Sequence, residues 1–251
     1  MKYFSRRYNL ISLTELFDGM ISKSFKNIPK YAMVVTLDDG WKENYDLLSI
    51  IKKYNFRPTL FLTSHLINTE RHFWWTTCDE NDVERLKRLP NSQRIAELKE
   101  KWFYDPDKEY LGDRQALNIS EIEMMKEHVD FGLHTCYHPI LTKCSFEEKR
   151  KEIIACKNKV EEILEYPIEF FSYPNGDYDD ECIEILRKCG VKIARTTDSG
   201  WNNTQSNLYK LKVTGVSDNG SKNKLIAELT GIPMYFQHFF KGSFNGLKNT
   251  N

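Results

Sequence analysis

Short apolar runs alternate with amphipathic helical stretches along most of this 251-residue chain. The runs predict buried strands over residues 32–37, 58–63, 129–133, 169–172 and 191–194, with a late strand over 208–213. Helices between the runs imply that consecutive strands pair in parallel. Polar residues follow the strands, at the end where a (β/α) barrel carries its chemistry. The alternation therefore predicts an α/β fold with a barrel.

Helix starts are marked by serine and glutamate residues three positions apart, which can cap each other's free amides. Three such pairs occur: Ser12 with Glu15, Ser120 with Glu123, and Ser145 with Glu148. Further helices are predicted over residues 44–54 and 179–188.

One segment, about residues 64–118, interrupts the alternation after the second strand. It is polar and aromatic, and helical stretches over residues 81–89 and 92–103 indicate an ordered insertion, because long structureless loops are uncommon in compact domains. We treat residues 1–251 as a single domain that carries this insertion.

Composition excludes several classes of function. Lysine plus arginine equals aspartate plus glutamate, 36 each, so nothing favours nucleic-acid binding. No apolar run reaches the length of a transmembrane segment, and the N-terminus lacks the pattern of a secretory signal. The six cysteines form no CxxC pair and suit a reducing compartment, so we expect a cytoplasmic protein. The oligomeric state stays unknown.

Two motifs at strand ends indicate metal chemistry. Asp38 and Asp39 follow the first strand; a cation would relieve the repulsion between adjacent carboxylates, although Asp-Gly is also a common turn. His134 and His138 follow a later strand at a spacing that can share a metal. Pro139 disfavours a helix there, so we expect a turn with both imidazoles pointing inward.

A carboxylate and two histidines with an open position describe a catalytic zinc-type site made by Asp39, His134 and His138. Asp38 could accept a proton from a bound water whose pKa the metal lowers. The loop Tyr173-Pro174-Asn175-Gly176 could aim backbone amides at an oxyanion, or be an ordinary turn.

The order and content of these motifs resemble the polysaccharide deacetylases, the NodB-homology group also called carbohydrate esterase family four. Residues 36–40 resemble the family's T-F-D-D-G, residues 134–139 match H-S/T-x-x-H-P in full, and residues 171–176 match F-x-Y-P-x-G. The resemblance spans about residues 8–213. It implies a distorted (β/α) barrel of about seven strands and the hydrolysis of an N-acetyl group on a sugar.

The resemblance also implies a role for each matching residue. Asp38 resembles the general base, and Asp39, His134 and His138 resemble the metal ligands. The amide of Asn175 resembles the oxyanion donor. The implied cofactor is a divalent metal, with zinc as the first choice and cobalt, nickel or iron as alternatives.

The chain departs from the family pattern in three places. Many members have an arginine in the third motif that pairs with the catalytic carboxylate, whereas Ser172 stands here. The leucine-x-histidine motif that supplies a general acid is not evident, and His238 is either a substitute or a packed core residue. The family's first strand, before the helix at Ser12, is expected to be missing.

Aromatic residues supply the candidate contacts with a substrate. Trp74 and Trp75 in the insertion form either a lid or saccharide platform, or an anchor for the insertion. Trp201, which follows a strand, either stacks on a sugar ring or packs in the core. Tyr173 and Pro174 complete the predicted substrate-binding set.

These features together predict a metal-dependent hydrolase that removes an N-acetyl or other N-acyl group from a sugar, in the synthesis of a surface polysaccharide or glycoconjugate. The expected partner is an N-acylated sugar or glycoconjugate. Two alternatives stay open: a deacylase of a small amide or ester, and a glycan-binding module whose catalytic site is retired.

Overall fold

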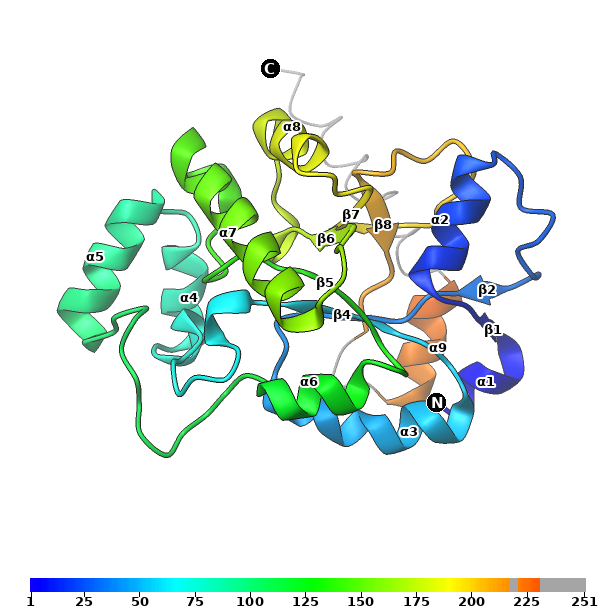
Figure 1. Cartoon of the computed structure of the whole chain (residues 1–251), viewed down its shortest axis with the longest axis horizontal. Helices are drawn as coiled ribbons and strands as arrows, with labels where there is room; N and C mark the ends of the chain where they lie inside the picture. Colours follow the sequence, from blue (N-terminus) through cyan, green and yellow to red (C-terminus); the bar gives the residue numbers. More distant parts are fainter. Residues whose placement is uncertain (217–220, 231–251) are drawn as a thin grey trace, which may run out of the picture.

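The fold is built on a curled sheet of six parallel strands, and a computed structural model describes residues 1–216 and 221–230 (Figure 1). The strands follow one another in chain order: β3 (Thr36–Leu37), β4 (Thr59–Leu62), β5 (Asp130–Leu133), β6 (Phe170–Ser172), β7 (Ile193–Ser199) and β8 (Leu211–Val213). Within the described residues β3 and β8 are the two edges, so the sheet forms an incomplete barrel. The predicted α/β barrel class is confirmed.

The apolar run over residues 32–37 is divided between two sheets rather than forming one strand. Its first part, β2 (Ala32–Met33), pairs in parallel with β1 (Asn9–Leu10) in a separate two-stranded sheet. Its last part is β3, which pairs with β4. The amide of Ile11 donates to the carbonyl of Met33 at 3.0 Å, whereas the amide of Thr59 donates to that of Val35 at 3.0 Å.

This division corrects two predictions. The prediction of a single strand over residues 32–37 was wrong, because the two ends of this run pair with two different strands. The expected absence of a strand before the first capped helix was also wrong, since β1 lies there.

Two of the three predicted helix caps are confirmed. α2 (Leu13–Ile21) and α7 (Phe146–Leu164) begin with reciprocal hydrogen bonds between Ser12 and Glu15 and between Ser145 and Glu148, respectively. α6 (Ile119–Met125) begins two residues earlier than predicted, because Asn118 and Glu121 form its capping box instead of Ser120 and Glu123. An asparagine side chain accepts a hydrogen bond at this position as well as serine does.

The remaining helices cover the sheet and its ends. The predicted helix over 44–54 begins as a 3-10 turn, η1 (Lys42–Leu47), and continues as α3 (Leu48–Tyr54). The others are α1 (Phe4–Arg7), α8 (Asp180–Lys188) and α9 (Lys222–Thr230). Figure 1 shows α3 and α6 near the bottom of the view and α8 near its top, and buried residues of α3, α6, α7 and α8 all belong to one apolar core against the sheet. In the described part of the chain, every helix is too short or too polar to span a membrane.

The insertion is ordered, as predicted, and leaves the sheet between β4 and β5. It contains the short turns η2 (Ser64–Leu66) and η3 (Trp74–Thr76), followed by α4 (Glu80–Leu86) and α5 (Asn91–Trp102). α4 and α5 lie at one end of the molecule (Figure 1). They enclose a small apolar core of their own, formed by Trp74, Leu86, Leu98 and Tyr104.

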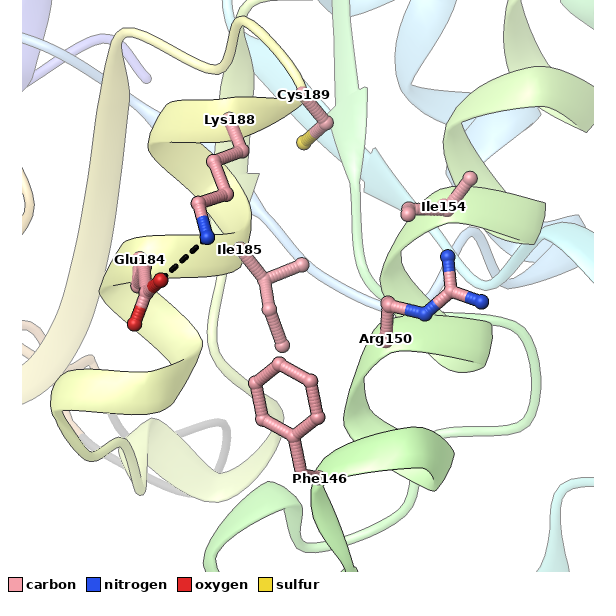
Figure 2. Close-up of a pocket in the computed structure, with 7 residues that line it drawn as sticks. All are labelled: Phe146, Arg150, Ile154, Glu184, Ile185, Lys188 and Cys189. Carbon is pink, nitrogen blue, oxygen red and sulfur yellow. Dashed lines mark hydrogen bonds and ion pairs between the residues drawn. The ribbon is translucent and has the colours of Figure 1, made fainter.

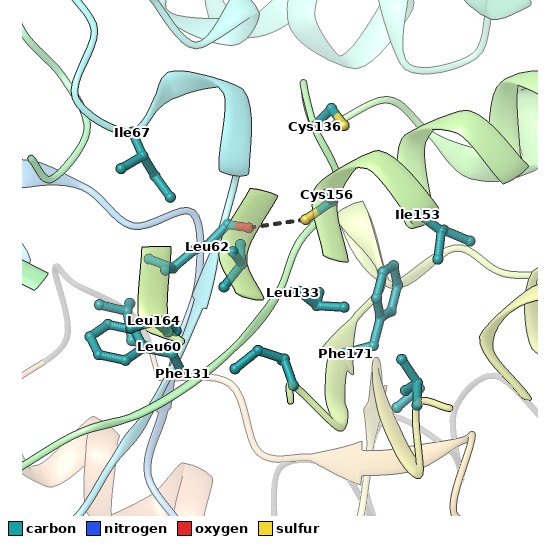
Figure 3. Packing of buried hydrophobic residues seen from close by; sticks show 14 of the residues in the cluster. Leu60, Leu62, Ile67, Phe131, Leu133, Cys136, Ile153, Cys156, Leu164 and Phe171 are labelled. Atoms are coloured by element: carbon teal, nitrogen blue, oxygen red, sulfur yellow. Dashed lines mark hydrogen bonds between the residues drawn. The ribbon is translucent and has the colours of Figure 1, made fainter. Parts of the chain in front are cut away.

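The main apolar core lies between the sheet and α7 (Figure 3). Leu62 from β4, Leu133 from β5 and Phe171 from β6 are fully buried there, together with Ile153 and Cys156 from α7. Burial of one such large side chain contributes about 1.5–3 kcal/mol. This packing holds the strands, and therefore the loops at their carboxyl ends, in fixed positions.

Candidate metal centre

Asp39, His134 and His138 meet at the carboxyl edge of the sheet, where each offers one ligand atom within 4.8 Å of the others. The Oδ1 atom of Asp39 lies 3.3 Å from Nε2 of His134 and 3.5 Å from Nε2 of His138. Asp39 follows β3 and His134 follows β5, so parallel pairing through β4 brings both to the same edge. The structure therefore brings together the three residues predicted as ligands.

Unusual backbone conformations aim two of these side chains. Asp39 has φ 71° and His138 has φ 54°, both in the left-handed region. Pro139 disfavours the right-handed helical conformation for the residue before it, which agrees with the predicted turn. Thr135 stabilises that turn, because its Oγ1 accepts the amide of His138 at 3.0 Å. Each strained residue costs about 1–3 kcal/mol, and such strain gathers at functional sites.

The hydrogen bonds of the site favour a cation. Nδ1 of His134 lies 2.7 Å from the carbonyl oxygen of Ser172, so this nitrogen carries a proton and, in the neutral imidazole, Nε2 presents a lone pair towards Asp39. Oδ1 of Asp39 is buried and accepts no hydrogen bond from the described residues. A divalent metal would satisfy this oxygen and both Nε2 atoms, so the donor set fits one.

The protonation states of Asp39 and His138 also suit metal binding. Burial raises the pKa of Asp39, but the neighbouring His134 and His138 and the hydrogen bond from Trp41 lower it to about 2. Burial and the neighbouring His134 lower the pKa of His138 to about 3. At neutral pH Asp39 is therefore ionised and His138 is neutral, which are the forms that bind a metal.

Asp38 lies beside this cluster and is held by two residues of neighbouring strands. Its Oδ1 forms an ion pair with the buried guanidinium of Arg195 from β7, and its Oδ2 lies 3.5 Å from Oγ of Ser172. Ser172 and Arg195 are direct partners in the pairing of β6 with β7. An arginine therefore pairs with Asp38, although it comes from the next strand and not from position 172.

The sequence analysis missed Arg195 as a site residue. A signal was present, because this charged residue directly follows the apolar run 191–194, and charged residues are rarely buried without a partner. Its partner could not be read from the sequence.

Replacing Arg195 by methionine should lower kcat on the order of 10²-fold, because Asp38 loses the contact that orients its carboxylate. Metal content should not change, since Arg195 contacts none of the three ligands. Steady-state kinetics of the metal-loaded variant measures this effect. Lys192→Met is the matched control, because Lys192 is a half-exposed cation paired with Glu169. An unchanged kcat in Arg195→Met would contradict the positioning role.

The loop after β6 leaves one backbone donor available. The amide of Tyr173 donates to the carbonyl of Arg195 at 3.2 Å, and the amide of Gly176 donates to that of Tyr173 at 2.8 Å. Proline at position 174 has no amide hydrogen. The amide of Asn175 has no acceptor among the described residues, and Asn175 is exposed. This agrees with its predicted role as an oxyanion donor, which stays a prediction.

Replacing Gly176 by alanine should destabilise the fold and displace this loop. Gly176 has φ 78°, and an added Cβ would lie 2.0 Å from Oγ1 and 2.6 Å from the backbone nitrogen of Thr197. We expect a loss of roughly 1–3 kcal/mol beyond the conformational cost, measured by urea unfolding. Gly112→Ala is the control, because Gly112 has φ 85° and an added Cβ there meets nothing within 4 Å. Equal losses in the two variants would rule out the clash.

Burial corrects three of the predicted substrate contacts. The side chains of Tyr173 and Trp74 are each 1% exposed, and Pro174 is also buried. The hydroxyl of Tyr173 donates to the carbonyl of Tyr209 at 3.1 Å, and the indole of Trp74 donates to the carbonyl of His138 at 3.0 Å. These rings cannot offer a face to a sugar, so Trp74 is an anchor of the insertion.

The other predicted residues differ in position. Trp75 packs against the ring of His138, with ring centroids 4.3 Å apart. Trp201 is 62% exposed beyond the end of β7, and its role in stacking on a sugar stays a prediction. His238, the candidate general acid, lies outside the described residues.

Glu152 of α7 is a second residue that the sequence analysis missed. Its partly buried carboxylate accepts hydrogen bonds from the amides of Cys136 at 2.8 Å and Tyr137 at 3.1 Å, between His134 and His138. Burial raises the pKa of Glu152, and the two amide hydrogen bonds only partly oppose this shift. Glu152 thus fixes the loop that carries both histidines, and no sequence pattern marks it.

A pocket of about 340 Å³ lies away from this site, between α7 and α8 (Figure 2). Phe146, Ile154 and Ile185 give it a mainly apolar lining, beside Arg150 and Lys188. None of the predicted site residues lines this pocket. The candidate site residues lie instead at the carboxyl edge of the sheet.

Comparisons with known proteins identify the family of this chain. Residues 26–194 match the family described as polysaccharide deacetylase. The curated Bacillus subtilis (strain 168) protein YxkH, whose name places it among polysaccharide deacetylases, is 21% identical over 186 residues, which are 74% of this chain and 51% of YxkH. The chain thus spans about half the length of that relative.

Solved structures are similar to this chain in fold. One is the Streptococcus pyogenes deacetylase PplD in complex with acetate, with a TM-score of 0.65, 19% identity, and coverage of 90% of this chain and 82% of PplD. Another is BC0361, a polysaccharide deacetylase from Bacillus cereus, with a TM-score of 0.64 and 19% identity. The match covers 91% of this chain and 58% of BC0361. At these identities the likeness shows the fold alone, whereas the family match covers most of the sequence. This chain belongs to the polysaccharide deacetylase family.

Proposed function

We propose that this chain is a metal-dependent hydrolase that removes the N-acetyl group from a sugar of a surface polysaccharide or glycoconjugate. The main support for this proposal is that Asp39, His134 and His138 converge beside Asp38, which Arg195 holds in place. Family membership supports a carbohydrate substrate. PplD, which is similar in fold, was solved with acetate, the acid that hydrolysis of an N-acetyl group releases.

The residues of the site have distinct tasks in such a reaction. A divalent metal held by Asp39, His134 and His138 would polarise the amide carbonyl and lower the pKa of the attacking water. Asp38 accepts a proton from the attacking water while the oxygen of the water bonds to the carbonyl carbon. The amide of Asn175 donates to the carbonyl oxygen as negative charge develops there.

The second half of the reaction breaks the carbon–nitrogen bond. The sugar nitrogen must gain a proton as it leaves, and the protonated Asp38 can return the one that it accepted. His238 is the other candidate for this step. The reaction breaks the amide C–N bond and one O–H bond of water, and it forms one C–O bond and one N–H bond. The products are acetic acid, which ionises to acetate by releasing its proton, and a free amino sugar.

Zinc is the metal that we propose for this site. One carboxylate and two imidazoles with an open position are typical of catalytic zinc, and the same set suits cobalt, nickel or iron. Reloading the demetallated protein with each ion separately, and comparing the recovered activity, would rank them.

Acetate release from a panel of substrates tests the proposed function. The panel contains N-acetylated saccharides, small acetamides and O-acetyl esters. We expect release from the saccharides that EDTA abolishes and added zinc restores. Activity that survives EDTA would overturn the metal dependence, and release from only small amides or esters would favour the alternative substrate class. Saccharide binding without any hydrolysis would indicate a retired site.

A further inference from the structure

Four aromatic side chains surround one side of the metal centre. We call Trp41, Phe73, Trp74 and Trp75 the aromatic collar. Trp41 follows the Asp-Asp-Gly turn, whereas the other three come from the insertion. Ring centroids lie 4.3 Å apart for Trp41 and Phe73, 4.8 Å for Phe73 and Trp75, and 5.8 Å for Trp74 and Trp75. The collar is therefore a continuous packed cluster.

Trp41 holds the carboxylate of Asp39. Its indole nitrogen donates to Oδ2 at 3.0 Å, while Oδ1 is the atom that faces Nε2 of His134 and His138. The hydrogen bond thus assigns the two oxygens to different partners. Asp39 is left with one oxygen for the metal, because the hydrogen bond from Trp41 fixes the rotation of its carboxylate group.

Two further members of the collar hold His138. The indole nitrogen of Trp74 donates to the carbonyl of His138, and the ring of Trp75 packs against the imidazole. Nδ1 of His138 is buried and has no hydrogen-bond partner in the described part of the chain. His134, in contrast, is oriented by the carbonyl of Ser172. Packing against the collar therefore replaces, for His138, the hydrogen bond that normally orients a ligating histidine.

The insertion also fixes the collar itself. Its returning segment forms an antiparallel bridge from Ala116 to Trp41, and the amide of Phe73 donates to Oε1 of Gln115 at 2.9 Å. The buried Arg94 of α5 lies over the ring of Trp74, 4.6 Å from its centroid. The insertion is thus joined to two of the three ligand positions through side chains of defined orientation.

We propose that the insertion strengthens metal binding, because its aromatic collar holds two of the three ligands in position. Trp41 is the positioning residue for Asp39, and Trp74 and Trp75 are the positioning residues for His138. This inference rests on the metal site of the proposed function. Loss of an outer-shell contact of this kind lowers metal affinity by about 10–100-fold.

Trp41→Phe tests the first contact, because phenylalanine retains an aromatic ring and removes the indole N–H. Zinc affinity of the demetallated protein, measured by competition with a chromophoric chelator, should fall by about 10–100-fold. The absorption bands of the cobalt-loaded protein should also shift as the carboxylate reorients. Trp102→Phe is the matched control, since Trp102 packs in the insertion's own core, and its zinc affinity should equal that of the wild type.

Trp75→Leu tests the second ligand independently and should weaken zinc binding over a similar range. Circular dichroism and the thermal unfolding midpoint establish that each variant is folded. Wild-type affinity in both Trp41→Phe and Trp75→Leu would overturn the role of the collar while leaving the metal site intact. A wild-type protein that binds no zinc, cobalt, nickel or iron would instead overturn the metal site itself.

Discussion

Asp38→Asn is expected to lower kcat for acetate release by about 10³-fold while zinc content stays at the wild-type level. Asparagine has nearly the same shape but cannot accept the proton of the attacking water. The ligand atoms are unaffected, because Asp38 contacts Arg195 and Ser172 and not the imidazoles. Steady-state kinetics and elemental analysis of the same sample measure both quantities.

Asp18→Asn provides the control for this change, since Asp18 is an exposed residue of α2. Its kcat should equal that of the wild type. If Asp38→Asn with full zinc content retained more than roughly a tenth of wild-type kcat, Asp38 would not be the base, because a positioned base contributes about 10²–10⁴-fold.

Asp39→Asn is expected to lose both zinc and activity. An amide oxygen carries no negative charge to offset the cation, and the loss of a direct ligand should exceed the about 10–100-fold effect of an outer-shell contact. The fold should survive, because Trp41 can still donate to the amide oxygen of the new side chain. Isothermal titration of the demetallated variant with zinc measures the affinity.

The two variants form a matched pair, because the same substitution is made at adjacent residues. We expect zinc to be retained in Asp38→Asn and lost in Asp39→Asn. Full zinc binding by Asp39→Asn, or loss of zinc only in Asp38→Asn, would show that the roles of base and ligand are exchanged.

The sequence by itself identified the three candidate metal ligands. Asp39 and His134 each follow an apolar run, and the carboxyl ends of parallel strands necessarily meet at one edge of the sheet. That Asp39 and His134 lie close together could therefore be predicted without knowledge of side-chain packing. The caps at Ser12 and Ser145 were predictable for a similar reason, since both partners lie within one helical turn.

Only the tertiary structure decided which residues support that site. Arg195 reaches Asp38 because the register of β6 and β7 sets it beside Ser172, and Trp74 is buried because the insertion folds back onto His138. The apolar run over 32–37 divides because β1 and β4 each bind one end of it. Burial and charge pairing depend on segments far apart in the chain, so local pattern alone does not specify them.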